Sequence, residues 1–62
     1  MANNMLTTKE AGIISDLLSF EALSCKKARL LSRTLTNEKL AENLRVIADN
    51  HEARFLSLMG LL

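Results

Sequence analysis

Residues 17–33, LLSFEALSCKKARLLSR, decide the fold of this 62-residue chain. At about 100° per residue, their apolar side chains gather on one side of a helix. Glu21 lies in the middle of that side, seven residues after Ile14 and seven before Ala28. Because an ionised carboxylate is rarely buried without a partner, the sequence predicts that a polar group from another segment meets Glu21.

The same periodicity extends in both directions and predicts a first helix over residues 8–34. Thr7 and Glu10 have the spacing of a capping box, in which two side chains satisfy two backbone N–H groups at the start of a helix. The apolar arc of this helix spans roughly 160°. Its members are Ile13, Ile14, Leu17, Leu18, Phe20, Cys25, Ala28, Leu31 and Leu35. The basic residues of its C-terminal half are expected to form a solvated face; they are Lys26, Lys27, Arg29 and Arg33.

A second helix is predicted over residues 37–59. Thr36 is the expected N-cap, and Gly60 is expected one position beyond the C-cap, where glycine commonly ends a helix. The apolar face of this helix contains Leu40, Ala41, Leu44, Ile47, Ala48, Phe55, Leu58 and Met59. His51 lies inside that face, as Glu21 does in the first helix.

A turn at residues 35–36 is short enough to make the two helices antiparallel neighbours. Facing residues then have numbers that sum to about 71 or 72, so Glu21 faces residue 50 or 51. We therefore predict an all-α fold, an antiparallel two-helix hairpin that forms one domain over residues 1–62, and we predict that Glu21 and His51 meet in it.

The composition limits the classes of function. The chain has no proline, tryptophan or tyrosine, 48% hydrophobic residues and a formal net charge of +1. This balance, without aromatic stacking residues, argues against nucleic-acid or membrane partners. The single cysteine, Cys25, cannot form an internal disulfide, and no signal peptide or membrane span is evident. We expect a soluble protein in the cytoplasm.

One pair of helices offers a small core, and small chains without disulfides or metals often self-associate. Leucines also lie off the main apolar face of the first helix, at Leu23 and Leu30, and the second helix has Val46, Ala53 and Leu56 in similar positions. These flanking stripes suggest a second contact surface. We expect a homodimer or higher oligomer that forms a four-helix bundle.

Two interpretations of Glu21 and His51 stay open. They are either a buried polar pair that sets the register of the helices, or, across a dimer, the ligands of a divalent metal such as zinc. Ferritin-like bundles use a Glu-x-x-His motif, and Ala48 stands here where that motif has its glutamate. The sequence shows no catalytic motif and no cofactor-binding motif, so we expect a protein that is not an enzyme.

The segments TTKEAGIISDLLSFEALSCKKARLLS and TNEKLAENLRVIADNHEARFLSLMGLL together resemble the spore coat F-like family of Firmicutes, over about residues 7–61. The resemblance is carried by Lys9, Asp16, Leu17, Glu21, the short turn, Leu40, Ala48, His51, Phe55 and Leu58. It implies a ferritin-like bundle fold and a structural role in sporulation or the spore coat, with other coat proteins as partners. When the metal ligands of a ferritin-like site are carried over residue by residue, only Glu21 and His51 have a counterpart in this sequence.

Overall fold

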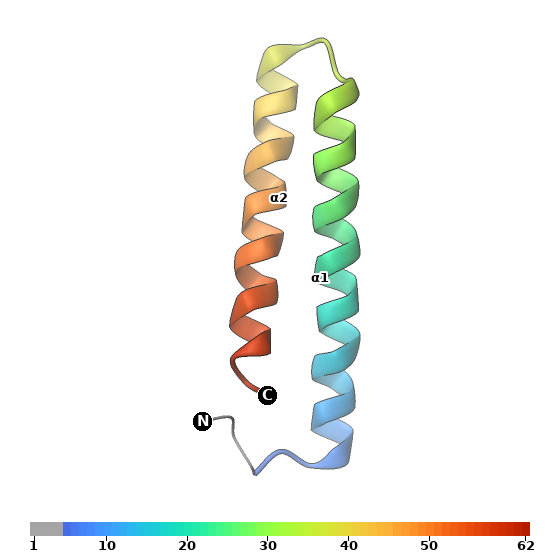
Figure 1. The fold of residues 1–62 in the computed structure, drawn as a ribbon, viewed down its shortest axis with the longest axis vertical. Helices are drawn as coiled ribbons and strands as arrows, with labels where there is room; N and C mark the ends of the chain where they lie inside the picture. The colour runs from blue at the N-terminus through green and yellow to red at the C-terminus, as the bar shows by residue number, and fades with distance from the viewer. Residues whose placement is uncertain (1–4) are drawn as a thin grey trace.

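The computed structural model describes residues 5–62 as two antiparallel helices, α1 (Thr8–Thr34) and α2 (Glu38–Met59), joined by a short turn (Figure 1). The described residues contain no strand. The predicted all-helical hairpin is confirmed. The predicted domain also included residues 1–4, which lie outside the described residues.

The capping box at the start of α1 is present as predicted. The Thr7 hydroxyl accepts a hydrogen bond from the Glu10 backbone N–H, and the Glu10 carboxylate accepts one from the Thr7 backbone N–H, both at 3.0 Å. Two of the unpaired N–H groups of the helix terminus are thereby satisfied by side chains.

The predicted start of α2 is wrong by one residue. Asn37, not Thr36, is the N-cap, and its side-chain oxygen accepts a hydrogen bond of 2.9 Å from the Leu40 backbone N–H. Asparagine is the stronger N-cap of the two residue types. The turn consequently covers residues 35–37, and α2 begins at Glu38.

The end of α2 at Met59 agrees with the sequence, but Gly60 has a different role from the predicted one. Gly60 is the C-cap itself, at φ −66° and ψ −14°, which is right-handed helical backbone. Its N–H continues the helical pattern by donating to the Leu56 carbonyl at 3.1 Å. This position therefore does not need the left-handed conformation that favours glycine.

The two helices meet along a narrow seam of mostly small side chains. The buried residues of α1 are Ile14, Glu21, Ala28 and Ser32, and those of α2 are Ala41 and Ala48. Ser32 follows Ile14 by five whole turns of 3.6 residues, so it lies on the same line of the helix. Ala48 is fully buried, and no larger side chain in residues 5–62 is.

The predicted wide apolar faces are therefore buried only along their middle. Exposed members of those faces keep between 38% and 58% of their surface; they are Ile13, Leu17, Phe20, Leu31, Leu35, Leu40, Ile47 and Met59. The physical reason is geometric, because one neighbouring helix covers a narrower strip than an arc of roughly 160°. Most of the large apolar side chains consequently lie beside the seam.

Candidate functional site

Glu21 of α1 and His51 of α2 meet at the centre of the seam, as the sequence predicts. The distance between Glu21 Oε1 and His51 Nδ1 is 2.5 Å. Glu21 is 7% exposed, and His51 is half-buried. The two numbers sum to 72, so the predicted register of the hairpin is confirmed.

A third residue, Arg54, completes the polar cluster. Its Nε donates to Glu21 Oε2 at 3.1 Å, and its Nη2 lies 3.0 Å from His51 Nδ1. His51 Nδ1 cannot donate to the carboxylate and accept from Arg54 together. The shorter contact, to a carboxylate that only accepts, assigns the proton to Nδ1, so Nδ1–H donates to Glu21. The Arg54 Nη2 contact is then a close approach of two donors.

The cluster favours the ionised form of Glu21. The hydrogen bond from His51 lowers the pKa of the Glu21 carboxyl below its ordinary value of 4.5, and Arg54 lowers it further by hydrogen bonding and by charge. Partial burial opposes both effects, because desolvation disfavours a charged group. Pairing outweighs desolvation, so Glu21 carries its negative charge at neutral pH.

Sequence reasoning missed Arg54. The residue lies three positions after His51 on α2, a spacing at which helical side chains are neighbours. It is more than half exposed, and its long side chain reaches across to Glu21. The available signal was this spacing from His51, but an arginine beside the seam is usually solvated.

The arrangement limits how a metal would be bound. Both Glu21 oxygens accept hydrogen bonds, and the Arg54 guanidinium lies against the carboxylate. Nε2 is the ring nitrogen of His51 that Glu21 leaves available. Within residues 5–62, no three or more His, Cys, Asp or Glu side chains lie close enough together to hold a metal ion. The structure brings the two predicted ligands together, and metal binding stays a prediction.

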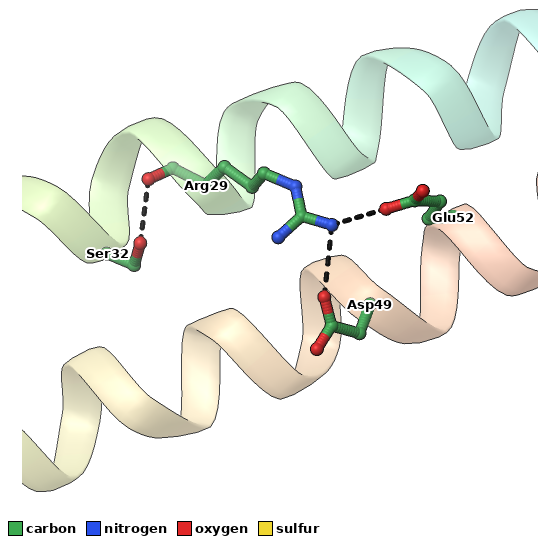
Figure 2. A network of polar contacts seen from close by, with 4 residues as sticks. All are labelled: Arg29, Ser32, Asp49 and Glu52. Carbon is green, nitrogen blue, oxygen red and sulfur yellow. Dashed lines mark hydrogen bonds and ion pairs between the residues drawn. The ribbon is translucent and has the colours of Figure 1, made fainter.

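A second polar network, on the other side of the seam, corrects the interpretation of Arg29. Arg29 is half-buried and its Nη2 donates to Asp49 at 3.0 Å and to Glu52 at 2.5 Å (Figure 2). These two carboxylates raise the pKa of Arg29. Its long side chain crosses from α1 to α2, so Arg29 belongs to the interhelical contact, whereas Lys26, Lys27 and Arg33 are exposed as predicted.

Cys25 does not join the Glu21 cluster. It lines an open hollow with Ala22, Glu52 and Phe55, on the side of the seam where Arg29 meets Glu52. The thiol is half-buried and unbonded to another cysteine. This position is typical of an inert packing thiol.

No helix in residues 5–62 combines the length and the apolar character that crossing a membrane requires. A scan against protein-family models and searches of curated proteins and of solved structures find no match to this chain.

Proposed function

We propose that this chain is a self-associating helical structural or interaction protein without catalytic activity, and that two hairpins pack into a ferritin-like four-helix bundle. The observation that carries the proposal is the exposure of large apolar side chains on a hairpin in which, within residues 5–62, the only fully buried residue is an alanine. A single interface of small residues offsets little of the entropy lost on folding. A second copy would supply the missing apolar contact.

The surface area supports the same proposal. A globular monomer of 6.9 kDa exposes about 4,000 Å², whereas this chain exposes 4843 Å². The excess of several hundred Å² is comparable with the roughly 800 Å² that each partner buries in a standard protein interface. This excess of exposed surface supports self-association.

Sedimentation equilibrium of the full chain at micromolar concentration tests self-association. We expect an average mass of at least twice 6.9 kDa, together with a helical circular dichroism spectrum. A helical protein that sediments as a monomer across this range would overturn the proposal.

The resemblance described above supports a more specific role, in sporulation or in the spore coat, with other coat proteins as partners. Its residues include Glu21 and His51, which meet in the structure, and Ala48, which is fully buried. Immunodetection in purified spores of the source organism tests this role. Absence of the protein from spores and from sporulating cells would contradict it and leave self-association standing.

The second candidate function is metal binding by Glu21 and His51 across a dimer. One observation favours metal binding through His51, because a carboxylate that accepts from Nδ1 is the usual support for a histidine that binds metal through Nε2. In this geometry Glu21 would orient the imidazole, and it could bind the metal itself only by giving up one of its hydrogen bonds. Zinc in excess should raise the melting temperature of the wild-type chain and leave that of His51→Ala unchanged. If zinc, iron and manganese all leave the wild-type melting curve unchanged, this function is excluded.

A further inference from the structure

We infer that a second copy of the chain docks on one particular broad face of the hairpin, with the Glu21, His51 and Arg54 cluster at the centre of the interface. We call this surface the apolar broad face; its members are Ile13, Leu17, Phe20, Leu31, Leu40 and Ile47. The inference rests on the proposed self-association and adds which surface performs it.

Two crossing contacts leave the seam on opposite sides and so distinguish the two broad faces. On one side the ring of Phe20 packs edge-on against His51, with centroids 6.3 Å apart, and Arg54 reaches Glu21. On the other side Arg29 reaches Asp49 and Glu52 (Figure 2). Phe20 and Arg29 are nine residues apart, which is about 180° around α1. The Phe20 side is thus opposite the charged Arg29 side.

The large apolar residues beside the seam gather on the Phe20 side. Ile13, Leu17 and Leu31 lie within about 60° of Phe20 around α1, and Leu40 and Ile47 lie within about 40° of Arg54 around α2. All are exposed, between 43% and 58%. Exposed large apolar residues that gather on the same side of two neighbouring helices indicate an interaction site more strongly than scattered single residues do.

The flanking stripes expected from the sequence lie elsewhere. Leu23 and Leu30 are about 160–180° from Glu21 around α1, so they point away from α2. Val46 is about 160° from Ala48 around α2 and points away from α1. Leu23 and Leu30 therefore lie on one outer edge of the hairpin and Val46 on the other. Leu56, about 80° from Ala48 around α2, lies toward the Arg29 side, so the stripes do not form one surface.

The chemistry of the apolar broad face fits a second copy of this chain. Glu21 is the central residue of α1, with thirteen residues of the helix before it and thirteen after it. A two-fold axis through the middle of the face therefore places two identical clusters near each other, as an isologous interface requires. Within each cluster the Glu21 carboxylate pairs with the Arg54 guanidinium, so the cluster itself can be covered without leaving the buried carboxylate unpaired.

A pair of double variants with equal charge tests this assignment. Leu31→Lys with Ile47→Lys places two charges on the apolar broad face, where each residue is 44% exposed. The matched control, Leu30→Lys with Val46→Lys, places the same charges one position earlier, on the outer edges, at 52% and 47% exposure. Sedimentation equilibrium should show the first variant as a helical monomer and the control associated like the wild type.

The outcomes separate the two proposals. If the wild type is monomeric, the proposal that the chain self-associates is wrong. A wild type that associates, with the control dissociated and the broad-face variant still associated, would overturn only the assignment of the face. Equal dissociation of both variants would also overturn it, because the effect would then follow added charge rather than position.

Thiol labelling decides the question if the broad-face variant fails to fold. In a Cys25→Ser background, Ser24→Cys places a thiol on the apolar broad face, seven residues from both Leu17 and Leu31. Ser19→Cys places one about 140° away, on the outer edge of the same helix. Alkylation of the first thiol should slow at least several-fold as the protein concentration rises through the association range, while that of the second stays constant. Equal protection of the two thiols would overturn the inference.

Discussion

Glu21 is held ionised inside the seam by two groups from the opposite helix, and this gives it a defined effect on stability. His51 donates to one of its oxygens and Arg54 to the other. No buried side-chain nitrogen or oxygen in residues 5–62 lacks a partner. These two hydrogen bonds to Glu21 stabilise the register of the hairpin most strongly while the Glu21 carboxylate is deprotonated.

The pH dependence of unfolding should show this effect. Because the pKa of Glu21 is lower in the folded chain than its ordinary 4.5, its contribution is fully present above pH 4.5 and is lost as the pH falls below that value. Urea unfolding from pH 7 to pH 3 should therefore show a stability gap between the wild type and Glu21→Gln that narrows below pH 4.5. A gap that stays constant would show that Glu21 does not have a lowered pKa.

Asn37 determines where α2 begins through a single hydrogen bond to the Leu40 N–H. Asn37→Ala should lower the free energy of unfolding by about 0.5–2 kcal/mol, the usual cost of losing an N-cap. Thr36→Ala, one residue earlier and without this bond, should change it by less than about 0.5 kcal/mol. Chemical denaturation of both variants checks the assignment, and a larger loss from Thr36→Ala would restore Thr36 as the cap.

The contact between the two helices is made largely by alanine and serine residues. Small side chains at these positions allow the two helix backbones to lie close together. Ala28 and Ser32 on α1, with Ala41 and Ala48 on α2, leave little side-chain volume between the backbones. Close approach explains how a short glutamate on one helix reaches a histidine on the other. It also explains why the larger residues lie beside the seam.

Enlarging the seam should separate the helices. Ala48→Leu adds three carbons at a fully buried position, and overpacking of this kind costs about 1–3 kcal/mol. Ala53→Leu adds the same group on the exposed side of α2 and should change stability by less than about 0.5 kcal/mol. Thermal unfolding of the two variants compares them. Equal stability would mean that the Ala48 position has room for a larger side chain.

The whole molecule is flat and elongated, with extents of 47 × 17 × 10 Å. Such a shape has a large surface for its volume, and its two broad faces differ in character, one apolar and one crossed by the Arg29 network. The more apolar of the two faces is the one that the proposed second copy would cover.

If association completes the core, stability depends on concentration. The melting temperature of the wild type should rise by several degrees for each tenfold increase in protein concentration, because dimer formation is linked to folding. The Leu31→Lys, Ile47→Lys variant should melt at a lower temperature that does not change with concentration. A concentration-independent melting temperature for the wild type would contradict coupled folding and association.

The sequence by itself determined the features that local chemistry controls. Helix periodicity, the Thr7 capping box and a short turn were sufficient to predict both helices, their antiparallel pairing and the meeting of Glu21 with His51. These rules act between residues close in the chain, or follow from counting along two helices from a known turn. The predicted N-cap of the second helix was wrong because Thr36 and the adjacent Asn37 are both residue types that cap helices.

Only the tertiary structure decided which part of each apolar arc is buried and which long side chains cross the seam. Burial depends on the width and distance of the neighbouring helix, and small residues at Ala41 and Ala48 made that distance short. Arg29 and Arg54 join the interhelical contact because their long, flexible side chains reach carboxylates on the opposite helix. Their positions on a wheel predict the direction in which they leave the helix, but the partner depends on what the other helix places within reach.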